Sequence, residues 1–245
     1  MSIGNISSIK ANSLDQRNHE LLSDSIIGEA QSYFENGLEL HDLGKYLAAE
    51  AVFLKAIKLA ENTDEKEIRA LSLHYLGNIE SWKSNFPQSI HYHKNARDLF
   101  LELDNLEYVA ISNNHISSGF YALGKYDSTI VYFKKNIENQ AAGNFKKTTH
   151  TTYQGLAIFK KKTENQETGN FDNTILASYQ GLAILYAKLY NYKEAYSYLQ
   201  QGIKYAEETG SSLLLAELYF TAGNLFLNNH VNKDIAIEYL EKAKI

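Results

Sequence analysis

Apolar residues recur along this chain at the spacing of one face of an α-helix. Two stripes show the pattern most clearly: Ala49, Phe53, Ala56, Ile57 and Ala60, and later Ala195, Leu199, Gly202, Ile203 and Ala206. Both stripes advance by 4, 7, 8 and 11 residues from their first member. This spacing places all five positions of a stripe on one side of a helix, so each stripe predicts an amphipathic helix with one buried face.

A turn precedes each stripe, and the turns are evenly spaced. Leu43-Gly44-Lys45-Tyr46 is followed by Ser84-Asn85-Phe86 and by Leu123-Gly124-Lys125-Tyr126, so positions 44, 84 and 124 lie 40 residues apart. A fourth turn, Leu189-Tyr190-Asn191-Tyr192, comes late, at 190 rather than 164. A second helix precedes each turn and carries a small residue, at Gly37, Gly77, Ser117, Ala183 and Gly223. The chain is therefore predicted to be a series of helix pairs in which small residues allow close approach.

These residues resemble the tetratricopeptide repeat, whose helix pair carries W-x2-L-G-x2-Y followed by A-x3-F. Leu76-Gly77 matches L-G, and Ala49 with Phe53 matches A-x3-F. The period of 40 exceeds the usual 34, and polar residues stand at three normally apolar positions, Asn36, Glu80 and Asn113. Long repeats of this kind are similar to those of kinesin light chains, Pins-type adaptors and bacterial Rap-type receptors. The resemblance implies an all-α, right-handed superhelical solenoid, and an unrelated helical bundle is the alternative.

The delay before the fourth turn coincides with a duplication. Tyr153-Gln154-Gly155-Leu156-Ala157-Ile158 returns 26 residues later as Tyr179-Gln180-Gly181-Leu182-Ala183-Ile184. Subtracting 26 from 190 restores 164, so a segment has been inserted into a regular array. We expect one extra helix, at about 146–167, with a thin apolar stripe and lysines at both ends. It would either shift the phase of the array or bulge outward. A marginally packed helix is favoured over a specialised basic binding element.

The predicted organisation is a flexible N-terminal tail at 1–25 followed by a solenoid at 26–245. Its five repeats are expected at about 30–68, 70–108, 110–143, 172–210 and 213–245. The last predicted helix carries Ile237, Tyr239 and Leu240 without a capping element after it. This apolar edge suggests self-association, a bound partner or a longer parent protein.

Composition narrows the possible classes of protein. The 245 residues carry 24 Lys and Arg against 29 Asp and Glu, a net charge of -5 that disfavours nucleic-acid binding. The absence of cysteine removes disulfides, thiolate catalysis and Cys-based metal sites. Neither a secretory signal nor a stretch approaching about 18 apolar residues is present, so we expect a cytoplasmic protein without a membrane partner.

Motifs for catalysis or cofactor binding are weak. Gly119 to Tyr126 fits G-x4-G-K but has Tyr126 where a P-loop needs Ser or Thr, and it coincides with a repeat turn. His91 and His93 are two residues apart and point to different helix faces, unlike metal ligands at i and i+4. We therefore expect no enzyme activity, catalytic residues, cofactor or metal.

The resemblance implies that the inner surface is lined by particular positions of each first helix. Aligned on the small residues, the predicted partner-binding side chains are Phe34, His41, His74, Asn78, Trp82, Asn114, Tyr121, Gln180, Lys188, Phe220, Asn224 and Asn228. Leu38, Asp42, Ser81, Ser118 and Ile184 occupy further lining positions. Asn and Gln side chains suit a peptide backbone because they both donate and accept hydrogen bonds. The family's carboxylate clamp is not reproduced, since Phe34 and Leu38 occupy two of its places.

The expected function is a non-catalytic protein-interaction scaffold that binds a peptide or helix in its concave groove. The alternative is a peptide-sensing regulatory module that controls an effector, as in Rap-type receptors. A rigid scaffold and a sensor should differ in whether peptide binding changes the compactness of the chain.

Overall fold

The computed structural model describes residues 25–63, 65–141, 170–210, 212–228 and 233–243, together with Leu22, and this part of the chain is helical. A first helix covers residues 25–42. The others are α2 (Tyr46–Glu61), α3 (Lys66–Trp82), α4 (Phe86–Glu102), α5 (Leu106–Ala122), α6 (Tyr126–Ala141), α8 (Asn170–Lys188), α9 (Tyr192–Thr209), α10 (Ser212–Asn228) and α11 (Lys233–Lys242).

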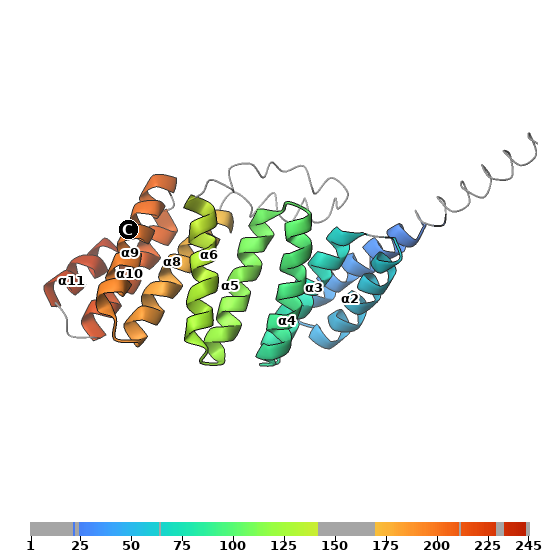
Figure 1. The fold of residues 1–245 in the computed structure, drawn as a ribbon, viewed down its shortest axis with the longest axis horizontal. Coiled ribbons are helices and arrows are strands. Elements are labelled where there is room, and N and C mark those ends of the chain that lie inside the picture. Colours follow the sequence, from blue (N-terminus) through green and yellow to red (C-terminus); the bar gives the residue numbers. More distant parts are fainter. Residues whose placement is uncertain are drawn as a thin grey trace, which may run out of the picture.

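The helices form antiparallel pairs stacked in one row (Figure 1). Each pair packs against the next along the chain, and the turns within pairs lie along one long edge while the turns between pairs lie along the other. The predicted all-α solenoid of helix pairs is therefore confirmed.

The turn within each of the first four pairs repeats one backbone geometry. Gly44 and Gly124 have φ angles of 70°, and Ser84 and Tyr190 occupy the same left-handed region with φ angles of 61°. In the first turn the Gly44 N–H donates to the His41 carbonyl, and the same bond recurs in the other three turns. Glycine adopts this conformation without steric cost, whereas an exposed Tyr190 side chain does so against its preference.

Small residues let the paired helices approach closely. A Cβ atom added to Gly37 would lie 2.5 Å from the Phe53 ring, and one added to Gly77 would lie 2.6 Å from the His93 ring. Gly223 faces Leu240 in the same way, at 2.5 Å. No side chain fits in these gaps, which explains the small residue in the first helix of these pairs.

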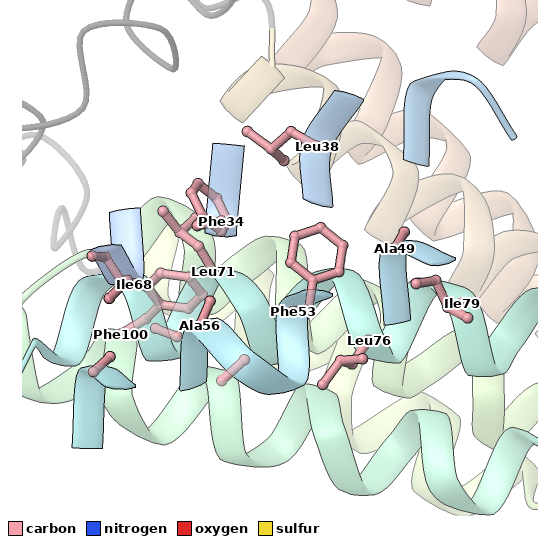
Figure 2. Packing of buried hydrophobic residues seen from close by; sticks show 14 of the residues in the cluster. Phe34, Leu38, Ala49, Phe53, Ala56, Ile68, Leu71, Leu76, Ile79 and Phe100 are labelled. Carbon is pink, nitrogen blue, oxygen red and sulfur yellow. The ribbon is translucent and has the colours of Figure 1, made fainter. Parts of the chain in front are cut away.

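The apolar core lies between the helices of each pair. Phe34 and Phe53, both fully buried, pack in its N-terminal part with Leu71 and Leu76 (Figure 2). A second cluster, around Leu199, fills the space between α8, α9 and α10. Burial of these side chains is the main source of stability, at roughly 1.5–3 kcal/mol for each large residue.

A polar junction separates the two apolar clusters. Asn136 of α6 is fully buried and donates to the Ala110 carbonyl and to Asn114 Oδ1, at 3.0 and 2.8 Å. Its Oδ1 atom accepts a 2.8 Å hydrogen bond from Asn113 Nδ2. Ser178 of α8 donates to Asn114 Oδ1 at 2.9 Å, so the network ties α5 and α6 to α8.

The array keeps its phase from α6 to α8. Although residues 142–169 separate the two helices, α8 packs directly on both α5 and α6, as the first helix of the next pair should. The second copy of the duplicated sequence occupies this place, with Gly181 against the Phe133 ring. The extra helix expected at 146–167 lies outside the described residues, as do nearly all of the predicted tail at 1–25 and the last two residues of the chain.

Candidate binding face

The first helices of the pairs form one face of the array. This first-helix face is the exposed side of residues 25–42 and of α3, α5, α8 and α10, of which α5, α8 and α10 contact one another in series. Side chains on it are positioned by rigid helices rather than by loops. Such a surface suits an extended ligand because each helix pair adds a further set of exposed side chains along the array.

An apolar depression lies between α8 and α10. Its volume is about 280 Å³, and it is lined by Ile184, Ala187, Phe220, Thr221, Asn224 and Leu225. Ile184 is 44% exposed and Phe220 is 57% exposed, so both side chains are accessible at the surface. The volume is enough for one large apolar side chain of a partner.

Polar groups border this depression. Gln180 Nε2 donates a 2.7 Å hydrogen bond to the Thr221 hydroxyl, which links α8 to α10. Asn224 lies in the lining and is only partly buried. The structure therefore brings together three predicted residues, Gln180, Phe220 and Asn224, and adds Ile184 from the wider set of lining positions.

Lys188 supplies a positive charge one turn beyond Ile184 on α8. Its ammonium group lies 4.7 Å from the Tyr121 ring centre and 5.1 Å from that of Tyr126. Hydrogen bonds to the hydroxyls of Tyr126 and Tyr121 raise the pKa of Lys188 above its usual value. Cation–π contacts hold this charge near the depression.

Two further predicted residues lie near the turns within pairs. Trp82, the last residue of α3, is 63% exposed and packs on Tyr46, with ring centres 4.7 Å apart. His41 is partly buried and lies edge-on to Tyr46 and Tyr75. Both are on the first-helix face but belong to the N-terminal end of the array, far along the chain from the depression.

Three sequence predictions for the face are wrong. Phe34 is fully buried in the apolar core, because Phe53 and Tyr75 pack against its ring. His74 is only 7% exposed, since other aromatic rings surround it. Neither side chain can contact a partner without local unfolding.

Asn114 is the third correction. Its Nδ2 donates a 2.9 Å hydrogen bond to the Thr174 carbonyl, and its Oδ1 accepts from Asn136 and Ser178. The amide is used within the polar junction and is not free to bind a peptide.

The remaining predicted asparagines differ in their surroundings. Asn78 is partly buried and lies 3.4 Å from His74 Nε2, while its Oδ1 atom has no hydrogen-bond partner among the described residues. Asn228 ends α10, and its side chain lies outside the described part.

The glycines of the G-x4-G-K pattern at Gly119 to Tyr126 have structural roles. Gly119 packs under Ile90, where a Cβ would lie 2.6 Å from that side chain, and Gly124 is the left-handed residue of a turn. Among the described residues, no group of three or more His, Cys, Asp or Glu side chains is arranged to hold a metal ion. None of the described helices is long and apolar enough to cross a membrane.

Comparison with known proteins agrees with this architecture. The tetratricopeptide repeat family matches residues 30–63. No curated protein matches the sequence. A protein assigned as a kinesin light chain with nearly identical TPR-like repeats, from Podosopora anserina, is 14% identical with a TM-score of 0.59, over 89% of this chain and 94% of that one. BtubC (BKLC) from P. vanneervenii is 13% identical with a TM-score of 0.62, over 91% of this chain and 89% of that one.

The first repeat therefore matches the tetratricopeptide repeat family in sequence, and the described array shares the fold of tetratricopeptide-like solenoids. The expected resemblance to repeats of the kinesin-light-chain type is confirmed. Folds of this kind generally mediate protein–protein interaction and are typically non-enzymatic scaffolds.

Proposed function

We propose that this protein is a scaffold that binds an extended peptide or a helix of another protein along its first-helix face. The depression between α8 and α10 carries the proposal, because it combines a cavity of about 280 Å³ with the exposed side chains Ile184 and Phe220. An apolar side chain of the partner would fill it, and Asn224 would hydrogen-bond the partner's backbone. Lys188 would favour a partner with negative charge nearby.

A selection experiment with the full chain tests this proposal. A library of random peptides is screened for binding, and the enriched peptides are measured against an Ile184→Asp, Phe220→Asp variant. A Leu101→Asp, Val131→Asp variant is the matched control, because these two side chains are about 50% exposed but lie on second helices, α4 and α6.

We expect enriched peptides to share an apolar residue and to bind the Ile184→Asp, Phe220→Asp variant at least about tenfold more weakly, since each buried anchor contributes more than about 1 kcal/mol. The control variant should bind as the wild type does. Failure to enrich any peptide, or equal losses in both variants, would refute the proposal.

A further inference from the structure

Two clusters of three aromatic rings stand one repeat apart in this protein. The first consists of Phe34, Phe53 and Tyr75, with ring centres 5.9, 6.2 and 5.3 Å apart. Adding the repeat length of 40 to each number gives His74, His93 and His115. The second cluster is therefore the same structural unit, with imidazoles in place of phenyl and phenol rings.

The geometry of this histidine triad (His74, His93 and His115) follows that of its apolar counterpart. His74 lies 5.2 Å from His93 and 5.1 Å from His115, between ring centres. His93 and His115 are stacked at 4.5 Å with an interplanar angle of 8°, as Phe53 and Tyr75 are stacked at 5.3 Å and 13°. The triad joins α3, α4 and α5, and thus connects the second repeat to the third.

The buried surroundings of the triad favour neutral imidazole rings over protonated ones. His93 is fully buried, and neither of its ring nitrogens has a hydrogen-bond partner among the described residues. His74 is nearly buried, with no partner for Nδ1 in the same part of the chain. An imidazolium has two N–H donors, so protonation would leave buried charge and unmet donors together.

Nearby groups add to this effect rather than offset it. Burial is the main cause that lowers the pKa of His74 and of His93 well below the usual value, and other histidines lower it further. Those histidines include His41 from residues 25–42, and no carboxylate is among the described groups that perturb the two rings. The phenol of Tyr108 also faces His74, edge-on, from α5. Burial lowers the pKa of His115 to about 4.

We propose that the histidine triad is an acid-operated joint between the second and third repeats. While neutral, it packs as Phe34, Phe53 and Tyr75 do; once protonated, its rings repel one another and attract water, and α5 separates from α3 and α4. This joint does not depend on the proposed peptide binding. It would change the angle between the N-terminal and C-terminal parts of the array, and with it the shape of the first-helix face.

The direction of the pH response follows from the lowered pKa values. Unfolded or opened histidine has a pKa near 6.5, so the open form binds more protons at acidic pH and is favoured as the pH falls. For His115 the loss develops between about pH 6.5 and 4. From about pH 7 to 5, His115 by itself would raise the opening constant by about twentyfold.

Substitution by the apolar triad's own residues gives the matched test. The full chain is compared with a His74→Phe, His93→Phe, His115→Tyr variant, which copies the first cluster into the second. Urea midpoints are measured from about pH 7 to 5 and converted to opening constants. We expect the wild type to lose far more stability than the variant over this range. Equal pH dependence in both proteins would overturn the proposal.

Two measurements on the wild type locate the effect. Hydrogen exchange at acidic pH, compared with the variant at the same pH, should rise in α3, α4 and α5 but not in α8 to α11, whose sequences contain no histidine. An even rise along the chain would contradict a local joint. NMR titration of the imidazoles keeps the test valid even where the variant fails to fold, because triad rings that titrate near pH 6.5 in the folded protein would overturn the proposal.

Discussion

The polar junction contains two asparagines, Asn113 and Asn136, at positions that differ from those of the other repeats. A double-mutant cycle on this pair tests how the third repeat accommodates them. Asn113 and Asn136 are hydrogen-bonded and buried where other repeats combine a large residue with a small one. The equivalent pairs are Tyr33 with Ala56, Leu73 with Ala96, Tyr179 with Gly202, and Tyr219 with Ala243. Tyr179 and Gly202 are in direct contact, since a Cβ on Gly202 would lie 2.9 Å from Tyr179 Cβ. Two medium-sized amides thus fill the space of one large and one small side chain.

Each single substitution should be costly. Asn136→Ala removes the acceptor of Asn113 Nδ2 and the two N–H donors that Asn136 shares among Ala110, Asn114 and Ser178. Asn113 is 2% exposed, so its amide would stay without a partner, at a cost of about 1–3 kcal/mol, and the cavity adds to it. Asn113→Leu leaves Asn136 Oδ1 unpaired and crowds the site, for a similar loss. The double variant recreates the Leu73 and Ala96 combination and should fall within about 1 kcal/mol of the wild type.

Urea unfolding followed by far-ultraviolet circular dichroism measures the three stabilities. Trp82, the only tryptophan, reports separately on the second repeat by fluorescence. The two signals are compared because repeat arrays can unfold in parts. Additive losses in the double variant would refute the idea that the amide pair replaces a large–small pair.

Three other changes test individual contacts. Gly77→Ala should destabilise the protein by about 1–3 kcal/mol, measured by urea unfolding, because the new Cβ would overlap the buried ring of His93; an unchanged midpoint would contradict this. Burial raises the pKa of the Glu67 carboxyl from 4.5 to about 7. Ionising this group in the folded protein therefore lowers the free energy of unfolding as the pH rises through that range. Glu67→Gln should raise the melting temperature above about pH 7 but not near pH 4.5. Lys83→Met removes the cation that lies 2.9 Å from the buried Glu80 carboxylate. The free energy of unfolding, measured by denaturant titration, should fall by about 1 kcal/mol, and by more at low salt. A loss independent of salt would argue against an electrostatic cause.

The regular part of the fold was predictable because it rests on local rules. The left-handed residues at 44, 84, 124 and 190 stand where the turn spacing placed them, including Ser84 and Tyr190, where no glycine marks the turn. The stripe around Ala49 and Phe53 is the buried side of α2, as its helical spacing predicted. Periodicity identifies which side of a helix faces its neighbour, since that depends on residue spacing alone.

The candidate site was predictable only in part. Position within the repeat identified Phe220, Asn224 and Gln180 around the depression, but the same rule also selected Phe34 and His74, which are buried. The difference lies in the side chains that neighbouring helices present at that position, and these vary from repeat to repeat. The histidine triad was missed although its 40-residue offset from Phe34, Phe53 and Tyr75 was present in the sequence. The 40-residue offset indicates a shared structural unit only when the structure shows that the three rings of each set pack against one another.

The sequence by itself determined that this chain forms helix pairs, where the turns between them fall, and that one segment is duplicated, because each depends on spacing along the chain. Tertiary packing decided that the second copy of the duplicated sequence packs on α5 and α6. Copy two places Ile175 and Leu176 in buried positions, whereas Thr149 and His150 stand at the equivalent places in copy one. It also decided that Asn114 serves the interior and that three histidines share one joint. These outcomes depend on contacts between residues from different helices, which no local pattern specifies.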